Sequence, residues 1–313
     1  MTTLFKLRFP SGISVQDNRH ILHSDMLWGA ICNAANLLFG SASVEAIRKP
    51  QAILMSSAFP FVEEELFFPR PLSFYKEPEN YADQKKFKKI RFISEKIWKE
   101  IISGKSINLQ QGVIQSLLWF EKTPTLEAFA VTLERPRVTL DRVLNSPTLF
   151  SSEETIYDDS VGFFFLANFE DETLKHIFSS ALRLLGDEGL GAERSVGKGW
   201  FRVEEARYQL PQIQNPNAFL LLSLYTPTED ELSSLDIENS FYEILERGGW
   251  VTSFGGMTLR RKKVRAFAEG SVLRFKQGMP KGQIVEVLSA QQSLSHNVYR
   301  NLQAFAIPIR LGE

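Results

Sequence analysis

One glycine-rich stretch decides the interpretation of this chain: Gly186-Asp187-Glu188-Gly189-Leu190-Gly191-Ala192-Glu193-Arg194-Ser195-Val196-Gly197-Lys198-Gly199. Its five glycines in 14 residues stand between an expected helix and an expected strand. Glycine permits positive φ and lets a ligand approach the backbone amides closely, so such a stretch favours phosphate binding. A flexible helix-to-strand connection is the alternative, but those connections usually have about 2 to 6 residues.

The stretch matches neither of the common nucleotide-binding motifs. A P-loop has four residues before its G-K-[ST] ending, whereas one residue too many separates Gly191 from Gly197, and Gly199 follows Lys198. The dinucleotide fingerprint G-x-G-x-x-G fails because Arg194 occupies the position of its last glycine. The mononucleotide and dinucleotide interpretations are both weakened. Arg194 and Lys198 are nevertheless cations that could bind phosphate.

The regions on either side of the stretch supply its helix and its strand. Apolar residues keep helical spacing from Leu174 to Leu185, and Gly186 ends this predicted helix. Trp200 to Glu204 alternates like a strand. Near the N-terminus the same signals predict a strand at Leu4 to Phe9 and a helix between two caps, Ser24 to Gly40.

A second half begins after the segment from Pro211 to Pro216, which is the best linker candidate in the chain. Beyond it the pattern predicts further strands and one short acidic helix: a strand at 219–225, a helix at 229–235, and strands near 241–245 and 264–275. Both halves thus share a coarse strand-helix-strand order without a tandem repeat of residues. We predict an α+β protein with two domains, residues 1–212 and 218–313.

The section from Arg135 to Asp159 lacks any sustained amphipathic period and carries a long polar run. It is interpreted as an exposed hairpin or arm. Residues 126–133 and 161–168 are apolar enough to be the strands from which the arm projects.

Two further stretches are strongly basic. Residues Lys85 to Lys99 are interpreted as a helix with a solvated lysine face, and nucleic-acid contact is the alternative. Residues Arg260 to Arg265 hold five cations in six positions, which would repel one another without an acidic partner. A nucleic-acid contact and a solvated turn are equally compatible with this second cluster.

The composition limits the possible partners. A chain of 313 residues with 43% hydrophobic residues can bury a large core, but its net charge of -1 leaves no global positive excess to attract a polynucleotide. Any nucleic-acid contact must therefore be local. The single cysteine, Cys32, and the missing signal peptide predict a cytoplasmic protein, and no apolar run is long enough for a membrane span.

Few residues suit catalysis or metal binding. His20 and His23 form an H-x-x-H pair, but no cysteine or third ligand nearby completes a zinc set. Asp158 and Asp159 are adjacent, so on an extended chain their carboxylates point to opposite faces and do not form a metal pair. A G-x-S-x-G elbow and a Gly-Gly-Asp-Asp motif are absent from the sequence, and no cofactor is expected.

The glycine-rich stretch resembles the loop of the RAMP superfamily, the CRISPR-associated proteins that bind guide RNA. His23 to Ala30 resembles the start of their first helix, and Gly248-Gly249-Trp250 with Ala268 to Val272 resembles their C-terminal half. Other segments fit the group of fourth subunits of type III-A Csm interference complexes, which is related to the Cas-five group: residues 54–61, 68–72, 137–142, 298–300 and 307–309. The likeness extends over nearly the whole chain.

The resemblance implies two ferredoxin-like (RRM-like) domains, a glycine-rich loop and a projecting β-hairpin arm. It further implies a non-catalytic subunit that holds the 5′ repeat-derived handle of the CRISPR RNA. Its neighbours would be the large polymerase-like subunit and a backbone RAMP subunit, and target RNA would be met only through the guide. In the family an arm inserts into the guide RNA, a role that the section from Arg135 to Asp159 could fill.

The expected RNA contacts come from four places. Arginine can contact phosphate through two hydrogen bonds, and glycine amides can follow a single-stranded backbone. The candidate residues are His23 and Ser24 at the first helix; Arg135, Arg137 and Arg142 in the arm; Gly189, Gly191, Arg194, Ser195, Gly197, Lys198 and Gly199 in the glycine-rich stretch; and Arg260, Arg261 and Lys263 near the C-terminus.

The strongest enzymatic alternative is a guide-processing endoribonuclease of the same superfamily, with His23 as general base. In those enzymes the glycine-rich loop tends to lie near the C-terminus. Here 114 residues follow Gly199, which favours the non-catalytic reading. A protein scaffold without RNA would suit the neutral charge but leaves the glycine-rich stretch unexplained.

Overall fold

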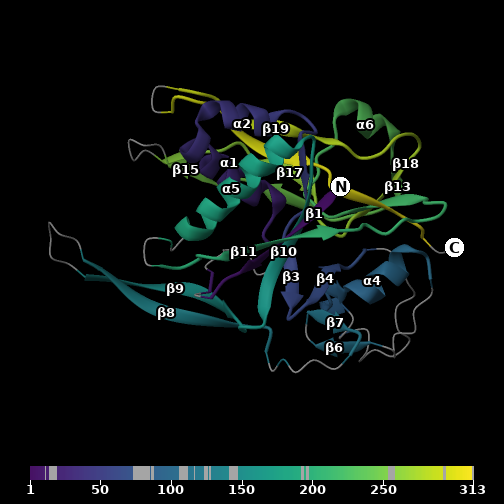
Figure 1. Cartoon of the computed structure of the whole chain (residues 1–313), viewed down its shortest axis with the longest axis horizontal. Coiled ribbons are helices and arrows are strands. Elements are labelled where there is room, and N and C mark those ends of the chain that lie inside the picture. Colours follow the sequence, from purple (N-terminus) through teal and green to yellow (C-terminus); the bar gives the residue numbers. More distant parts are fainter. Residues whose placement is uncertain are drawn as a thin grey trace.

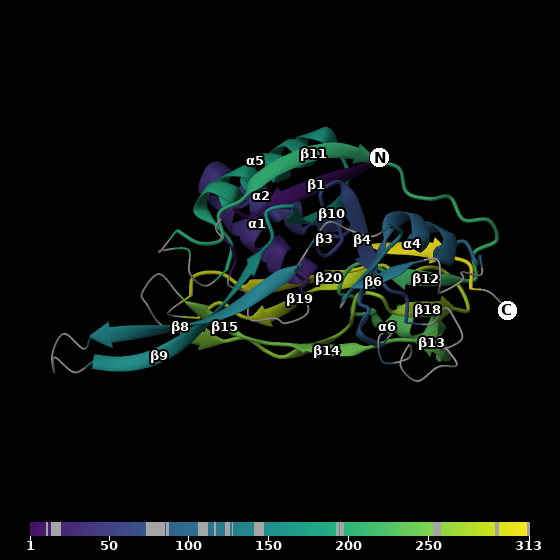
Figure 2. The same cartoon turned by 90° about the horizontal axis from the view of Figure 1, so that it is seen from below.

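The computed structural model describes most of the chain, namely residues 1–10, 12–13, 20–72, 85, 88–105, 112–115, 117–122, 126, 128–140, 147–191, 194, 197–252, 258–291 and 294–311. Two mixed layers of sheet and helix form the body, and a long hairpin projects from one end of it (Figures 1 and 2).

The N-terminal sheet has the strand order of a ferredoxin-like fold. Its core order is β11-β1-β10-β3, with β2 also pairing with β10, and every pair among these strands is antiparallel. The strands are β1 (Thr2–Arg8), β2 (Ile53–Met55), β3 (Phe59–Val62), β10 (Val161–Phe169) and β11 (Arg202–Tyr208). Three helices accompany them: α1 (Ser24–Phe39), α2 (Ser41–Arg48) and α5 (Glu172–Glu188).

The alternating side chains of the central strands are buried on both faces of this sheet. Phe5 and Phe165 stack at 4.9 Å and pack with α1 and α5, whereas Leu4, Phe164 and Leu166 belong to the core on the opposite face. Neighbouring residues of a strand point to opposite faces of the sheet, so each apolar face must pack against other elements of the protein. The helices pack against one face, and the C-terminal half packs against the other.

The helix before the glycine-rich stretch ends later than its sequence predicts. Gly186 lies inside α5, and Gly189 is the C-cap, with its N–H bonded to the Leu185 carbonyl at 2.8 Å. Gly186 is required there for packing, because an added Cβ would lie 2.6 Å from the carbonyl oxygen of Phe201. The predicted cap at Ser24 was also wrong by one position, since His23 is the N-cap of α1.

The region around Lys85 to Lys99 is not one helix. Lys85, Lys88 and Lys89 are helical, but β5 (Phe92–Ser94) interrupts the stretch before α4 (Glu95–Ile102) begins. The strand pairs with β4 (Glu65–Pro69) and β7 (Leu118–Phe120), and β6 (Val113–Gln115) completes this extension of the sheet. Phe92 and Ile93 are fully buried, so tertiary pairing overrides the helical period here.

The C-terminal sheet repeats the ferredoxin-like strand order. Its order is β13-β18-β12-β21, with antiparallel pairs, from β12 (Ala218–Leu221), β13 (Leu235–Phe241), β18 (Val272–Phe275) and β21 (Ala306–Ile309). The predicted acidic helix is α6 (Glu229–Ser234). A hairpin of β19 (Gly282–Leu288) and β20 (Val298–Gln303) stands where a second helix would follow β18.

Two small antiparallel pairs are inserted between β13 and β18. One joins β14 (Ile244–Arg247) to β17 (Val264–Phe267), and the other joins β15 (Trp250–Thr252) to β16 (Thr258–Arg260). Trp250 is directly opposite Arg260 in the second pair.

The two halves share a hydrophobic core. One cluster contains Phe59 and Phe164 from the first half together with Leu220, Phe305 and Ile307 from the second. The two sheets therefore pack against each other around one common core, and the halves do not have two independent cores.

The predicted arm is a hairpin of β8 (Ala130–Leu140) and β9 (Pro147–Tyr157), which pair over 11 residues each. It extends away from the body in both views (Figures 1 and 2). The arm begins earlier than predicted, because residues 130–133 belong to the hairpin rather than to a supporting strand. The predicted strand at 161–168 is confirmed as β10.

Candidate nucleic-acid interface

The glycine-rich stretch forms a loop with a closed base. Gly189, Gly191, Gly197 and Gly199 all have positive φ, between 75° and 105°. The N–H of Leu190 donates to the carbonyl of Gly199 at 2.8 Å, which joins the two ends of the loop. Such backbone favours glycine, and the four positions explain why the sequence is so rich in it.

Two kinds of glycine can be distinguished in this loop. A Cβ on Gly199 would lie 1.9 Å from the carbonyl oxygen of Leu190, and one on Gly189 would lie 2.8 Å from that of Lys198. By contrast, Gly197 is exposed, and nothing lies within 4 Å of a Cβ added there. Gly189 and Gly199 therefore serve close packing at the base, whereas Gly197 leaves open space at the outer part near exposed Arg194.

Backbone hydrogen bonds connect this loop to the arm. The N–H of Gly199 donates to the carbonyl of Gly12 at 3.1 Å, and the N–H of Ile13 donates to the carbonyl of Thr155 in β9 at 3.3 Å. Residues 12 and 13 thus form a ladder between the loop base and the arm base. This connection could not be derived from sequence, because the three segments lie far apart in the chain.

An aromatic cluster fixes the arm where it leaves the body. The His20 ring lies 5.3 Å from Phe129, and its Nδ1 lies 3.2 Å from the hydroxyl of Tyr157. Tyr157 in turn packs edge-on against Phe163 of the sheet at 5.0 Å. His20 is therefore part of the arm base rather than half of a metal site.

The outer arm exposes apolar side chains. Val138 and Leu149 are opposite each other and are 58% and 71% exposed. Val131 and Leu133 are exposed as well. Arg135 and Arg137 lie on β8, but their side chains are outside the described residues, as are Arg142 and Ser195 altogether.

His23 and Ser24 are buried between the two halves. The Nδ1 of His23 lies 2.8 Å from Oε1 of Glu269, which also accepts a hydrogen bond from the Ser57 hydroxyl. The Ser24 hydroxyl accepts the N–H of Leu224 at 3.2 Å. With His23 only 3% and Ser24 4% exposed, neither side chain reaches an RNA at the surface, and we remove both from the expected contacts.

Glu269 is charged in this environment although it is buried. Burial alone raises the pKa of its carboxyl, but neighbouring His23 and the Ser57 hydroxyl outweigh that effect and hold the pKa below its usual value. The pair therefore joins the N-terminus of α1 to the segment between β17 and β18.

A second buried ionic group is centred on Asp25, two residues after His23. Asp25 accepts hydrogen bonds from Arg247, at 3.0 and 3.1 Å, and from Nη1 of Arg300. Arg300 also donates to the carbonyl of Gly248 at 2.9 Å. No local sequence pattern marks either arginine as a partner of Asp25, since Arg300 is 275 residues away.

The five cations between Arg260 and Arg265 do not act alike. Arg261 is half-buried over Gly249, where burial and the nearby charge of Arg247 lower the pKa of its guanidinium. Lys263 forms an ion pair with Glu246 at 2.5 Å. Arg260 is exposed, and its guanidinium stands 5.9 Å from the ring centre of Trp250, which is 62% exposed.

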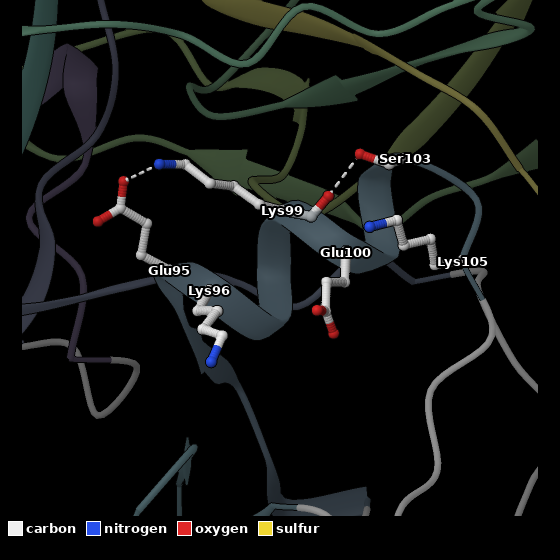
Figure 3. A pocket seen from close by; sticks show the side chains of 6 residues that line it. All are labelled: Glu95, Lys96, Lys99, Glu100, Ser103 and Lys105. Atoms are coloured by element: carbon white, nitrogen blue, oxygen red, sulfur yellow. Dashed lines mark hydrogen bonds and ion pairs between the residues drawn. The ribbon is translucent and has the colours of Figure 1, made fainter.

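An open groove of 350 Å³ on α4 carries mixed charge (Figure 3). Lys99 pairs with Glu95 at 2.6 Å, and Lys96 pairs with Glu121 across the extension of the sheet. Glu95 also accepts the hydroxyl of Tyr208 at 2.8 Å. Lys96 and Lys99 thus already have acidic partners, which favours a solvated lysine face on α4 over nucleic-acid contact there.

Metal chemistry finds no support in the part of the chain that the structure describes, where no three His, Cys, Asp or Glu residues gather as a ligand set. Among the same residues, no helix is long and apolar enough to cross a membrane.

Comparisons with known proteins agree with this architecture. The RAMP superfamily profile matches residues 6–202, and the profile of the CRISPR Csm4 C-terminal domain matches residues 214–309. A curated relative, CRISPR system Cms protein Csm4 of Thermococcus onnurineus, is 26% identical over 94% of each chain. The protein of the same description from Methanocaldococcus jannaschii is also 26% identical, over 86% of this chain and 83% of its own.

Solved structures show the same fold. A chain of the Csm3–Csm4 subcomplex of the type III-A CRISPR-Cas interference complex has a TM-score of 0.68 at 21% identity, covering 98% of this chain and 99% of its own. A chain of the Csm1–Csm4 cassette in complex with cA4 has a TM-score of 0.63 at 22% identity, with 100% and 99% covered. Because the superfamily profile spans more than half of the sequence, this chain belongs to the RAMP superfamily, and residues 214–309 match the profile of the CRISPR Csm4 C-terminal domain.

Proposed function

We propose that this chain is the Csm4 subunit of a type III-A CRISPR interference complex and holds the 5′ repeat-derived handle of the CRISPR RNA without cutting it. The observation that carries the proposal is the backbone ladder from the glycine-rich loop through Gly12 and Ile13 to the arm. These hydrogen bonds hold two elements beside each other that could both bind single-stranded RNA. One is a loop with accessible backbone, and the other is a projecting hairpin.

Backbone hydrogen bonds support a phosphate site at this loop. The base is closed by the bond between Leu190 and Gly199, and the N–H of Gly197 donates to the carbonyl of Arg194 at 3.0 Å. The guanidinium of exposed Arg194 can contact a phosphate through two hydrogen bonds, and Lys198 adds a second cation.

The endoribonuclease alternative loses support from the position of His23. A general base must come within hydrogen-bond distance of the RNA hydroxyl that it activates. His23 is instead buried and occupied by Glu269, with Ser57 on the same carboxylate. We therefore favour binding over cleavage.

The partners that we propose are those of the similar proteins. Relatives have been solved as a Csm3–Csm4 subcomplex and as a Csm1–Csm4 cassette, so a backbone subunit and a large polymerase-like subunit are the expected neighbours. Leu37, Leu38 and Phe39 at the end of α1 are 57%, 46% and 44% exposed. Three consecutive exposed apolar residues support a surface that a partner covers.

The proposal is tested by the RNA that copurifies with the reconstituted complex. We expect guide RNA to be retained by the wild-type complex and reduced in the variant with Arg194→Ala and Lys198→Ala. A matched control removes two lysines that are paired within the protein, Lys96→Ala with Lys99→Ala, and should retain wild-type levels. Each lost phosphate contact should also reduce the salt dependence of affinity by about 1 in log–log slope.

Two results would contradict the proposal. If the ratio of absorbance at 260 and 280 nm shows no nucleic acid in the purified assembly, the proposed RNA binding is wrong. Cleavage of repeat RNA by the wild type, abolished in His23→Ala, would replace binding with catalysis.

A further inference from the structure

The hairpin of β15 and β16 presents an aromatic ring and a cation on one outer face. Trp250 and Arg260 are directly opposite each other, and residues opposite in an antiparallel pair share a face. The next pair along, Val251 and Leu259, is half-buried on the other face. Trp250 is 62% exposed and the Arg260 side chain is exposed as well, so this face of the hairpin presents a flat ring with a cation beside it.

The backbone beneath this ring is held from inside the protein. Arg300 donates to the carbonyl of Gly248 at 2.9 Å, and the N–H of Arg261 donates to the carbonyl of Gly249 at 3.0 Å. The Arg261 side chain lies against Gly249, where an added Cβ would be 2.8 Å from its Nη2. These contacts turn Arg261 inward, whereas Trp250 remains exposed.

Arg260 decides the chemistry of a ligand at Trp250, because its guanidinium stands 5.9 Å from the centre of the indole ring. Lys263 pairs with Glu246, and the nearby charges of Arg265 and Arg260 also help to lower the pKa of that carboxyl. An exposed indole with a guanidinium beside it is complementary to a polyanion with flat groups. Single-stranded RNA fits this description, because it carries a phosphate next to each base.

We infer that Trp250 stacks on an unpaired base of single-stranded RNA while Arg260 contacts the adjacent phosphate, as a binding site separate from the glycine-rich loop. The β15–β16 hairpin, the loop and the arm lie toward the same end of the molecule in both views, so one strand of RNA can approach all three (Figures 1 and 2). This inference rests on the proposed function and names a base-contacting residue for it.

The test uses the purified full chain and a single-stranded RNA oligonucleotide of repeat sequence at fixed salt. Fluorescence anisotropy of labelled RNA gives the affinity, and quenching of tryptophan emission reports stacking. Trp250→Leu should weaken binding by at least about fivefold and remove most of the quenching, because stacking of one base is worth that much or more. Trp250→Phe keeps an aromatic face and should recover most of the affinity.

The matched control is Phe241→Ala, since Phe241 is an aromatic residue with 48% exposure on β13, a strand of another sheet than the β15–β16 hairpin. It should bind RNA as the wild type does. The loop variant with Arg194→Ala and Lys198→Ala should lose affinity yet keep the Trp250 quenching at saturating RNA. Circular dichroism checks that each variant is folded, and the comparison of the leucine and phenylalanine variants keeps the test valid if removing the ring lowers stability.

The outcomes separate this inference from the proposed function. If Trp250→Leu binds RNA as tightly as the control while the loop variant does not, stacking at Trp250 is wrong and the proposed function stands. If Trp250→Leu keeps RNA but loses a protein subunit from the reconstituted complex, the surface is a protein interface. Failure of the wild type to bind RNA would overturn both.

Discussion

At the scale of single residues, the glycines of the loop have different tasks. Gly199 has φ of 75° and no room for a Cβ, while Gly197 has φ of 81° in open space. The first glycine supports the fold and the second shapes the proposed RNA-binding surface. A comparison of identical substitutions at these two positions separates the tasks.

We expect Gly197→Ala to lower the free energy of unfolding by about 1 kcal/mol, which is the ordinary cost of left-handed backbone for alanine. Gly199→Ala should cost about 1 to 3 kcal/mol more, since the new methyl group forces the Leu190 carbonyl to move. Urea denaturation measures both values. Equal destabilisation of the two variants would contradict the closed base of the loop.

The buried pair of His23 and Glu269 makes the stability of the fold depend on pH in the acid range. The folded-state pKa of Glu269 lies below its unfolded value of 4.5, so the carboxylate stabilises the fold above about pH 4.5. This contribution is lost as the pH falls through the lower folded-state pKa. At more acid pH the group is protonated in both states and contributes nothing.

Glu269→Gln should therefore be less stable than the wild type by about 2 to 4 kcal/mol at pH 7, with the gap closing as the pH falls below 4.5. Urea denaturation from pH 7 to pH 3.5 measures the difference. His23→Gln is the partner control and should reduce the same pH dependence. A constant gap between wild type and Glu269→Gln at all pH values would argue against a charged Glu269.

At the scale of elements, the arm is a separable hairpin on a fixed base. The contacts that fix it come from the end of β9, through Thr155 and Tyr157. Its outer part exposes Val138 and Leu149 and pairs along its full length with itself. The outer arm is thus expected to serve binding rather than stability.

The arm can be shortened without disturbing its base. Glu134 and Glu153 are paired directly, so residues 135–152 can be replaced by an Asn-Gly turn that closes the remaining strands. We expect the melting temperature of the isolated chain to stay within about 2 °C of the wild type, because no core residue is removed. Guide-RNA retention in the reconstituted complex should fall.

The control for the shortened arm is a variant that keeps its length but replaces the exposed pair, Val138→Thr with Leu149→Thr. If this variant loses as much RNA as the shortened arm, the apolar pair makes the contact. Wild-type RNA retention by the shortened arm would contradict a role of the arm in guide binding.

At the scale of the whole molecule, two ferredoxin-like halves depend on each other. Phe305 and Ile307 of the second half lie in the same buried cluster as Phe59 and Phe164 of the first. Two buried ionic groups, at Glu269 and Asp25, cross the same boundary. The domain boundaries at residues 212 and 218 remain a prediction. They separate two topological units, but we do not expect the two units to be stable apart from each other.

The full chain should unfold in one cooperative transition in calorimetry. The fragment of residues 1–212 alone would expose the face of Leu4, Phe164 and Leu166, and we expect it to aggregate or to melt well below the full chain. Phe305→Ala should lower the stability of the whole chain by about 3 to 5 kcal/mol. Two separate transitions, with the first half unaffected by Phe305→Ala, would contradict a shared core.

The sequence by itself determined the features that local rules control. Helical spacing and alternation located the strand and helix of the first half, loss of period located the arm, and clustered glycine located a loop with positive φ. These signals act within a few residues, so they can be read without knowing the partners of each segment. Even so, Gly186 and Ser24 were placed wrongly as caps, since their roles depend on Phe201 and Leu224.

The tertiary structure alone decided which charges and rings are available. It paired Lys263 with Glu246, turned Arg261 inward, buried His23 and Ser24, and left Trp250 exposed. It also joined the glycine-rich loop to the arm through residues 12 and 13. The physical reason is that ion pairs, burial and sheet ladders form between residues up to hundreds of positions apart, and local sequence carries no record of those partners.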